Sequence, residues 1–330
     1  MQFRKFGKTD LLISEKGFGA WAIGGDAAVG GTPIGWGPAD DRSSIAAIKA
    51  SVDAGVNFFD TADFYGLGHS EELLGKEIGS NQNIIIATKV GHRSIDDKII
   101  LDYSKEYILE ACDKSLKRLK RDTIDFYQLH SARIHHLQEG ECIEAMVLLK
   151  QQGKIRYWGL SLNTFYPDAE ADYLMMNELG DGFQLVFNLM NQRASEVIKK
   201  ASVKEYGIIA RMPLQFGLLT GKFNKDSKFP PSDHRSFRLT SEIMQKTISI
   251  LEEKVWPIAE NLNMSKTDIA LNFILSFPGV STVIAGIRSE EQAKQNTSES
   301  VWLDTQTISY LQTVYEQEWK PVIALMEKQL

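Results

Sequence analysis

Short runs of apolar, strand-forming residues alternate with amphipathic helical stretches along the whole chain. The apolar runs lie near residues 16–21, 57–60, 84–89, 124–129, 155–161, 183–187, 208–212 and 282–285. Strand patterns that alternate with helical patterns in this way are typical of β–α units and a parallel sheet. The pattern therefore predicts eight strands, each followed by helical segments.

Several of the predicted helices have recognisable ends. Asp40 or Asp41 is a suitable N-cap for a helix that ends at Gly55. Ser70 is suited to begin a second helix, which ends at Gly79. Further helix boundaries are expected at Gly153, Gly180, Gly207 and the capping box Ser265 to Asp268.

We expect the eight units to close into one α/β barrel, a (β/α)8 TIM barrel that spans residues 1–330 as a single domain. The units fill most of the chain, and neither a linker nor a block of like charge divides it. Before the first unit, the segment FRKFGKTDLLIS predicts a small β-hairpin with a Gly-containing turn. After the eighth strand we expect extra C-terminal helices.

The composition is that of an ordinary globular protein. The 330 residues include 37 Lys and Arg and 43 Asp and Glu, with a formal net charge of -6. Because positively and negatively charged residues are interspersed along the chain, we expect no nucleic acid partner. An apolar window of about 18 residues and a signal-peptide core are both missing, so we expect a cytoplasmic protein without a membrane span. Cys112 and Cys142 lack the spacing of a zinc or redox motif, so we expect no metal.

In such a barrel the functional residues are expected directly after the strands, because the βα loops form one face. Three consecutive strands end in polar or ionisable residues, within FFDTADFYG, IIIATKVG and IDFYQLHS. The side chains at these ends are Asp60 with Tyr65, Lys89 and His130. Neighbouring strand ends of a closed barrel can bring all four to one spot.

These four residue types can together polarise and protonate a carbonyl group while a hydride arrives at its carbon. A lysine ammonium beside a tyrosine lowers the pKa of the phenol from about 10, and an aspartate holds the ammonium in place. The tyrosine is then a usable proton donor, and a histidine can bind the substrate oxygen. The cluster therefore predicts proton transfer to a carbonyl that accepts a hydride, and it requires neither a metal nor a nucleophile.

The segments GVNFFDTADFYGLGHSEELLG, ATKVG and DFYQLH resemble the aldo-keto reductase superfamily, of the bacterial or channel-β-subunit-like type. The resemblance covers nearly the whole chain and implies the same (β/α)8 barrel. It implies a catalytic tetrad of Asp60, Tyr65, Lys89 and His130, with Tyr65 as the general acid. It also implies NADP(H) as the cofactor, bound without a Rossmann fold, and no strand in this chain is followed by G-x-G-x-x-G.

By the same resemblance, residues of the later strands are expected to bind the cofactor. Ser161 and Gln184 match the residues that hold the nicotinamide carboxamide, and Asn163 is offset by one position from the family's asparagine. The segment after the seventh strand resembles the one beneath the pyrophosphate, and the segment after the eighth resembles the adenosine site. The expected contacts there are Leu214, Gly217, Leu218, Thr220 and Lys222, then Gly286, Arg288, Gln292 and Asn296.

Two arginines have expected roles at this cofactor site. Arg211 occupies the position of a tyrosine that stacks on the nicotinamide in many members of the family, and it could stack there or attract an anionic substrate group. Arg288 matches the residue that binds the 2′-phosphate and so favours NADPH over NADH. Residues 229–235, FPPSDHR, resemble a loop that covers the cofactor in one branch of the family.

Aromatic residues near the tetrad are candidates for a substrate pocket. Trp21 and Trp36 in the first βα loop, and Phe64 beside the expected acid, can line a pocket or pack the barrel mouth. The remaining histidines are expected to be solvated or locally bonded: His69, His92, His135, His136 and His234. We expect the adjacent His135 and His136 to point apart and to form a poor metal pair.

The sequence thus favours NADPH-dependent reduction of a small aldehyde or ketone, or the reverse oxidation of an alcohol or sugar. Two alternatives stay open, and so do the oligomeric state and the identity of the carbonyl compound. One alternative is an NADP(H)-binding regulatory or interaction protein with little turnover. The other is a barrel enzyme that acts on sugar phosphates through a Schiff base on Lys89.

Overall fold

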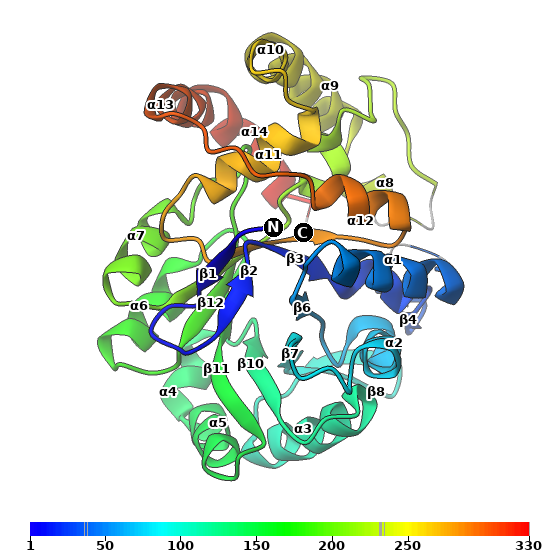
Figure 1. Cartoon of the computed structure of the whole chain (residues 1–330), viewed down its shortest axis with the longest axis vertical. Coiled ribbons are helices and arrows are strands. Elements are labelled where there is room, and N and C mark those ends of the chain that lie inside the picture. The colour runs from blue at the N-terminus through cyan, green and yellow to red at the C-terminus, as the bar shows by residue number, and fades with distance from the viewer. Residues whose placement is uncertain (36, 38, 231–232, 234, 330) are drawn as a thin grey trace.

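The computed structural model describes residues 1–35, 37, 39–230, 233 and 235–329. Eight parallel strands close into a barrel in the order β3, β6, β7, β10, β11, β12, β13 and β14, and β14 pairs again with β3. Each strand overlaps one of the eight predicted runs, so the predicted barrel is confirmed. Helices surround the barrel on its outside (Figure 1).

The bounds of the elements follow the alternation seen in the sequence. The barrel strands are β3 (Lys16–Gly19), β6 (Phe58–Asp60), β7 (Ile85–Val90), β10 (Ile124–His130), β11 (Ile155–Ser161), β12 (Gly182–Val186), β13 (Gly207–Arg211) and β14 (Thr282–Gly286). Outside the barrel, the described residues form the antiparallel pairs β1 (Phe3–Lys5) with β2 (Leu12–Ser14), β4 (Ala28–Val29) with β5 (Thr32–Pro33), and β8 (His92–Ile95) with β9 (Lys98–Leu101). The helices are α1 (Asp41–Asp53), α2 (His69–Glu77), α3 (Lys105–Leu119), α4 (Ile134–Glu139), α5 (Glu141–Gln151), α6 (Asp168–Met176), α7 (Ser195–Val203), α8 (Arg235–Arg238), α9 (Ser241–Ile250), α10 (Trp256–Asn261), α11 (Lys266–Leu275), α12 (Glu290–Asn296), α13 (Thr305–Val314) and α14 (Lys320–Glu327). Short helical segments of other types are η1 (Ala20–Gly24), η2 (Tyr65–Gly68), η3 (Gln215–Thr220), η4 (Leu251–Val255) and η5 (Tyr315–Trp319).

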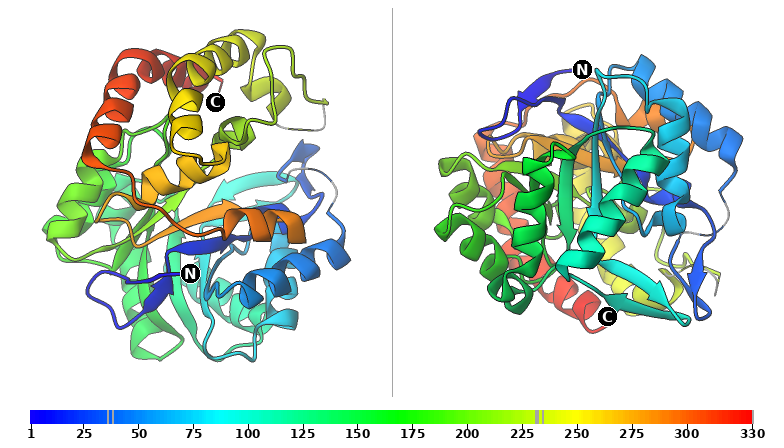
Figure 2. Two further views of the ribbon diagram at one scale, coloured as in Figure 1. Left: turned by 45° about the horizontal axis from the view of Figure 1, so that its top comes forward. Right: turned by 90° about the horizontal axis from the view of Figure 1, so that it is seen from below.

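The helices beyond the regular units gather on one side of the barrel. α13 and α14 follow the eighth unit, and α9 and α10 lie in the long connection between β13 and β14. These four helices group at the top of Figure 1 and of the left view in Figure 2, and α14 packs against α9. The expected extra C-terminal helices are therefore present.

Most of the predicted helix ends are confirmed. Asp40 and Ser265 cap α1 and α11, each by accepting a hydrogen bond from the backbone N–H three residues later. The prediction that Ser70 begins α2 is wrong, because α2 begins at His69. The buried hydroxyl of Ser70 is hydrogen-bonded to that of Thr61 at 2.8 Å, so a tertiary contact takes the place of a cap.

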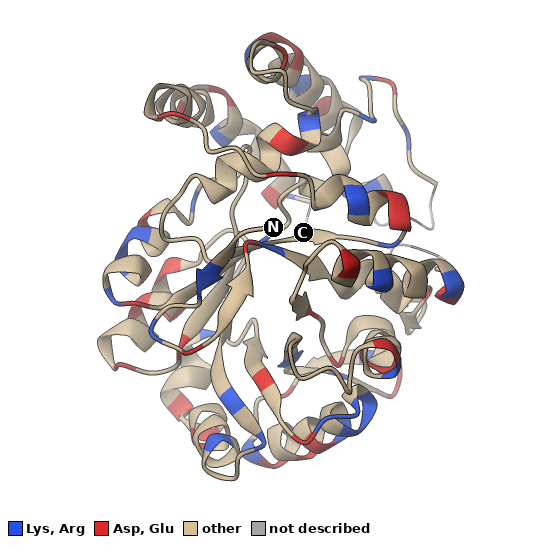
Figure 3. Ribbon diagram, viewed as in Figure 1, with Lys and Arg blue, Asp and Glu red and all other residues tan. Residues whose placement is uncertain are grey.

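Charged residues of both signs are spread over the outer helices, as Figure 3 shows. Many of them form exposed ion pairs one helical turn apart, such as Lys246 with Glu242 and Lys294 with Glu290. Exposed pairs of this kind contribute at most about 1 kcal/mol each. Within the described part of the chain, no helix is long and apolar enough to cross a membrane.

The predicted N-terminal hairpin, β1 with β2, closes the end of the barrel at which the strands begin. Phe6 in its turn is fully buried among the barrel strands, and its ring lies edge-on to Phe126 with centroids 4.9 Å apart. Gly182 and Gly207 are the first residues of two strands, and a Cβ at either would meet the Phe6 ring at 2.5 or 2.4 Å. The Phe6 plug therefore requires glycine at both positions.

Phe6→Ala should lower the free energy of unfolding by about 3–5 kcal/mol, because it removes a buried ring and leaves a cavity. Urea denaturation followed by circular dichroism measures the change. Phe3→Ala is the matched control, since Phe3 lies on the same hairpin and is 46% exposed. Phe3→Ala should change the free energy of unfolding by no more than about 0.5 kcal/mol. Equal effects of the two substitutions would contradict the plug.

Candidate active site

The carboxyl ends of three neighbouring strands bring the predicted tetrad together. Asp60 is the last residue of β6, Lys89 lies in β7, and His130 is the last residue of β10. Tyr65 begins η2, after the short loop that follows β6. Because β7 pairs with both β6 and β10, the four side chains meet at one point of the barrel rim.

Lys89 is at the centre of this cluster and is fully buried. Its Nζ donates to Asp60 Oδ1 at 2.5 Å, to the carbonyl oxygen of Thr61 at 2.7 Å and to the Tyr65 hydroxyl at 3.1 Å. An ammonium group has three N–H donors, so each is used. The position of the Tyr65 hydroxyl is therefore tied to a buried ion pair.

The second oxygen of the Asp60 carboxylate is held by two buried amides. Gln128 of β10 donates to Asp60 Oδ2 at 3.0 Å, and Gln184 of β12 donates to the same oxygen at 2.7 Å. Both glutamines are almost completely buried. The carboxylate that holds Lys89 is therefore itself fixed from two further strands.

His130 lies beside Tyr65 and beside a second histidine, His92. The centroid of its ring is 6.0 Å from that of Tyr65 and 4.2 Å from that of His92, edge-on in both cases. His92 is the first residue of β8. The prediction that His92 is solvated or only locally bonded is therefore wrong: the site holds two imidazoles where the sequence predicts one.

The pKa shifts at Lys89 and Tyr65 are set by burial and by each other. Burial alone lowers the pKa of Lys89, but Asp60 and Tyr65 outweigh it and the net shift is upward. Burial raises the pKa of Tyr65, and the Lys89 ammonium offsets only part of that rise. The expectation that Lys89 brings the pKa of Tyr65 below its ordinary value is wrong in net direction, because desolvation dominates. At neutral pH the lysine is charged and the phenol is protonated.

The two imidazoles are both neutral at neutral pH. Burial lowers the pKa of His92 to about 4, and Lys89 contributes in the same direction. Burial also lowers the pKa of His130 well below its ordinary value, with further contributions from His92, Lys89 and Arg211. The Nδ1 atom of each ring is buried and has no hydrogen-bond partner among the described residues. The pair therefore has unused hydrogen-bonding capacity.

Ser161 and Gln184 lie at the rim, where the predicted carboxamide site would be. Ser161 is the last residue of β11, and its Cα is in register with that of His130 on one side and that of Gln184 on the other. Asn163 follows two residues later, and its Oδ1 accepts from two backbone N–H groups of its own turn. The side-chain oxygen of Asn163 thus stabilises a local turn.

Arg211, the last residue of β13, adds a second cation to the rim. Its guanidinium donates to the carbonyl oxygen of Leu162 at 3.2 Å and to the Thr164 hydroxyl at 3.1 Å. Its Nε is buried and has no hydrogen-bond partner within the described part of the chain. Burial lowers the pKa of Arg211, and Tyr65 and Asp60 oppose that shift. Because a guanidinium stays charged in proteins, Arg211 brings a permanent positive charge close to the tetrad.

The residues matched to the pyrophosphate site form one turn after β13. Leu214 precedes η3, which contains Gly217 with a φ of 88°. Thr220 Oγ1 donates to the carbonyl oxygen of Gly217 at 2.7 Å and accepts from the backbone N–H of Lys222. Leu218 is fully buried and anchors the turn. The turn therefore has a fixed backbone, with the Lys222 side chain exposed beside it.

The residues matched to the adenosine site lie together after β14. Gly286 is the last residue of that strand, and Arg288 follows with an exposed side chain that forms no ion pair within the described residues. Gln292 in α12 accepts from the backbone N–H of Arg288 at 3.0 Å. Asn296 ends α12 and is 5% exposed. The loop is thus held by α12 while the guanidinium faces solvent.

The two predicted pocket aromatics both lie against the tetrad or its neighbours. The Trp21 ring is edge-on to Tyr65 with centroids 4.7 Å apart, and its Nε1 is buried without a hydrogen-bond partner among the described residues. Phe64 lies 5.4 Å from His92, centroid to centroid. Trp36 lies outside the described residues. So do Pro231, Ser232 and His234 of the expected cofactor loop.

Gln128 and His92 are site residues that the sequence analysis misses. Gln128 is a polar residue inside a buried strand, where a side chain needs a hydrogen-bond partner, and this is a readable signal. His92 gives no comparable signal, because its place at the rim depends on how β8 leaves the end of β7. Gly91, between the two strands, has a φ of 134°, which redirects the chain.

The prediction that His135 and His136 point apart is also wrong. Their ring centroids are 3.8 Å apart, and His136 Nδ1 accepts from the backbone N–H of Arg133. No group of three or more His, Cys, Asp or Glu side chains that could hold a metal occurs in the described part of the chain.

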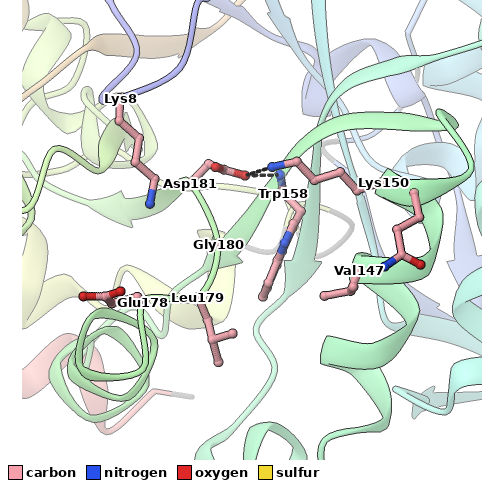
Figure 4. A pocket seen from close by; sticks show the side chains of 9 residues that line it. Lys8, Val147, Lys150, Trp158, Glu178, Leu179, Gly180 and Asp181 are labelled. Carbon is pink, nitrogen blue, oxygen red and sulfur yellow. Dashed lines mark hydrogen bonds and ion pairs between the residues drawn. The ribbon is translucent and has the colours of Figure 1, made fainter.

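A hollow of about 460 Å³ lies on another part of the barrel, beside the start of β12. Lys150 and Asp181 face each other across it and form an ion pair of 3.3 Å, and the Asp181 carboxylate also accepts from the backbone N–H of Trp158 (Figure 4). These two charged groups therefore already have partners. None of the four tetrad residues lines this hollow, so the chemistry is assigned to the rim.

The free energy of unfolding should decrease as the pH is lowered. At mildly acidic pH the histidines bind protons in the unfolded chain, but His92 and His130 stay neutral in the folded protein because they are buried. His92 binds a proton near pH 6.5 in the unfolded chain but near pH 4 in the folded protein. Its contribution to the free energy of unfolding is therefore complete above pH 6.5 and is lost as the pH falls toward 4. Between pH 7 and pH 5 this loss is about 2 kcal/mol. His92→Phe should therefore lose about 2 kcal/mol less than the unsubstituted protein over that range. Urea titrations at the two pH values measure it, and identical losses would disprove a buried neutral His92.

Comparison with known proteins agrees with this geometry. The chain is 32% identical over 299 residues to the uncharacterized oxidoreductase YqkF of Bacillus subtilis, covering 90% of each chain. It is 29% identical to the NADH-specific methylglyoxal reductase of Escherichia coli, covering 88% of this chain and 91% of that protein. The solved holo form of aldo-keto reductase AKR11C1 from Bacillus halodurans superimposes with a TM-score of 0.78 at 28% identity, covering 97% of this chain and 99% of that one.

A family profile also matches most of the chain. The profile of the Aldo/keto reductase family matches residues 17–316, from the first barrel strand to the helices after the last. This span includes the whole tetrad and each residue matched to the cofactor. The chain therefore belongs to the aldo/keto reductase family.

Proposed function

We propose that the protein reduces the carbonyl group of a small aldehyde or ketone to an alcohol, with Tyr65 as the proton donor. The observation that supports this most directly is the 3.1 Å hydrogen bond from Lys89 to the Tyr65 hydroxyl, at a rim that also holds the neutral His130. A phenol beside a fixed cation can release its proton, because the phenolate left behind is stabilised by the ammonium.

Each tetrad residue has a separate task in this proposal. Tyr65, protonated at neutral pH, gives its proton to the oxygen of the substrate. Lys89 stabilises the resulting phenolate, and Asp60 keeps the ammonium charged and in place. His130 is neutral, so it can donate a hydrogen bond to the same oxygen without competing as an acid.

We further propose that the cofactor is NADPH, which supplies the hydride when bound. The residues at the rim fit such a group. The orphaned donors Trp21 Nε1 and Arg211 Nε lie beside the tetrad, where polar atoms of a ligand would satisfy them. Gly217 gives a turn with no side chain in the way of a phosphate, and exposed Arg288 offers a guanidinium suited to bidentate binding of the 2′-phosphate.

The arrangement of Lys89 argues against a Schiff-base enzyme. A lysine that attacks a carbonyl must be neutral and must have a free lone pair. Here the pKa of Lys89 is raised, and its ammonium already donates three hydrogen bonds. A cofactor-binding protein without turnover is the remaining alternative, and the intact set of donors around Tyr65 favours catalysis over it.

Tyr65→Phe should reduce the rate of carbonyl reduction by at least about 100-fold, since it removes the general acid. The dissociation constant for NADPH should change by less than about threefold, because the ring remains. Oxidation of NADPH at 340 nm measures the rate, and quenching of tryptophan fluorescence measures binding. Tyr310→Phe, at an exposed tyrosine, is the control and should keep the full rate. Full activity of Tyr65→Phe would refute the assignment of the acid.

Arg288→Ala should weaken NADPH binding by about 10- to 100-fold and leave NADH binding nearly unchanged, because only NADPH carries the 2′-phosphate. Fluorescence titrations with both nucleotides measure this. Lys294→Ala is the control: Lys294 lies on the adjacent helix, but its ammonium is paired with Glu290 at 2.7 Å. An equal loss for both nucleotides would contradict a 2′-phosphate site, and no binding of either would refute the proposed reductase.

A further inference from the structure

The β8–β9 hairpin leaves one strand edge free. In the described part of the chain these two strands form a sheet of their own, so β9 pairs with β8 alone. The hairpin lies at the margin of the molecule, at the lower right of the right view in Figure 2. Every residue of β9 is exposed, and Ile99, Ile100 and Leu101 are 43%, 39% and 46% exposed. The edge therefore presents a row of aliphatic side chains to solvent.

The hydrogen bonds of the hairpin identify the backbone groups that are free. The backbone N–H of Asp102 donates to the carbonyl oxygen of Gly91, and the same register places Ile100 opposite Arg93. In an antiparallel pair every second residue bonds to the partner strand, and the residues in between direct their N–H and C=O groups to the other side. Ile99 and Leu101 therefore direct theirs to the free edge.

β9 lacks the devices that usually prevent such an edge from pairing. Natural edge strands are protected by a proline, a bulge or a charged residue within the strand. β9 has the sequence KIIL, its pairing with β8 runs without a bulge, and its one charge, Lys98, lies at the end next to the turn. The edge is therefore suited to accept a further strand.

The β9 edge of a second copy of this chain fits in one antiparallel register. Free residues must face free residues, and Ile99 opposite Leu101 of the second copy gives two such pairs and four backbone hydrogen bonds. The two-fold axis then passes through Ile100. A register centred on Ile99 instead would bring Asp97, a turn residue with a φ of 57°, into the ladder. One centred on Leu101 would bring in the buried Tyr103.

The charges agree with the same register. With the two-fold axis at Ile100, Lys98 of each copy lies opposite Asp102 of the other. Lys98 is exposed and forms no ion pair with the residues that the structure describes. The Asp102 carboxylate accepts from Arg93 at 2.8 Å and twice from Ser104, which leaves one of its about four acceptor sites for a lysine. An apolar centre is thus flanked by two ion pairs.

From this geometry we propose that β9 is a self-association site, where two copies of the chain pair antiparallel about a two-fold axis through Ile100. The product is one sheet of four strands in the order β8, β9, β9 and β8. Because a two-fold contact is closed, it uses the β9 edge of both copies and stops at a dimer. A contact of one short strand pair is small, so we expect a dissociation constant of about 1–100 µM. The inference does not depend on the proposed carbonyl reduction.

Sedimentation velocity over a concentration series from about 1 to 300 µM tests the association. The average mass should rise from 37.1 kDa toward about twice that value. Ile100→Glu places two like charges opposite each other and should raise the dissociation constant at least about tenfold. Leu262→Glu, at another exposed aliphatic residue, is the control and should leave it unchanged. Circular dichroism checks that both variants are folded.

Disulfide cross-linking tests the register. The two native cysteines are buried, so an introduced exposed thiol is the one available for cross-linking. Ile100 of one copy lies directly opposite Ile100 of the other, with Cα atoms about 4.5 Å apart, which a disulfide can span. The two Ile99 residues lie diagonally, at about 7–8 Å, which it cannot. Under mild oxidation Ile100→Cys should therefore cross-link at least about tenfold faster than Ile99→Cys or Val203→Cys, at a residue that is 86% exposed elsewhere on the surface.

Three outcomes would overturn the proposal. One is a mass of a single chain at every concentration, as expected if β9 instead accepts a strand from another protein. Another is a dimer that Ile100→Glu leaves unchanged, which would place the interface elsewhere. The third is an equal rate of cross-linking for all three cysteine variants, which would show random collision instead of a paired edge.

Discussion

A charged lysine and a charged aspartate buried together at the barrel mouth constrain the rest of the structure. Removing two such charges from water costs several kcal/mol per ion unless close pairing and further hydrogen bonds compensate. Here Lys89 donates to three acceptors, and the free oxygen of Asp60 accepts from two buried amides. The residues of this network come from β6, β7, β10, β12, η2 and the loop between β6 and η2. The ion pair is therefore satisfied only when the strands stand in their native register.

A second buried carboxylate, that of Glu71, helps to hold the elements that carry the tetrad. Glu71 of α2 is fully buried and accepts from the Thr88 hydroxyl at 2.5 Å and from Arg118 Nε at 2.6 Å. It thereby joins α2 to β7 and α3. α2 can approach α3 this closely because of Gly75, where a Cβ would meet the backbone oxygen of Arg118 at 2.1 Å. Since η2 leads directly into α2, these contacts also position Tyr65.

The features that could be predicted from the sequence are those that depend on local pattern. Buried parallel strands are continuous apolar runs, and their ends mark the active face, so the eight strands and the neighbourhood of Asp60, Lys89 and His130 follow from the chain alone. His92 could not be placed, because the β8–β9 hairpin turns at Asp96 and Asp97 with positive φ values of 48° and 57° instead of at a recognisable Asn-Gly pair. The direction of the Tyr65 pKa shift also required the fold, since burial, which no sequence pattern measures, outweighs the neighbouring ammonium.

The protonation states at the rim bear on the direction in which the proposed reaction runs. Reduction consumes a protonated phenol, and burial raises the pKa of Tyr65, so that form is present at neutral pH. Oxidation of an alcohol in the same site has to start from the phenolate, which burial disfavours and which only the cations Lys89 and Arg211 support. His92 and His130 stay neutral and cannot act as the acid in place of the tyrosine. The same desolvation that makes the ion pair costly therefore also keeps the proton on Tyr65 until a carbonyl oxygen is there to receive it.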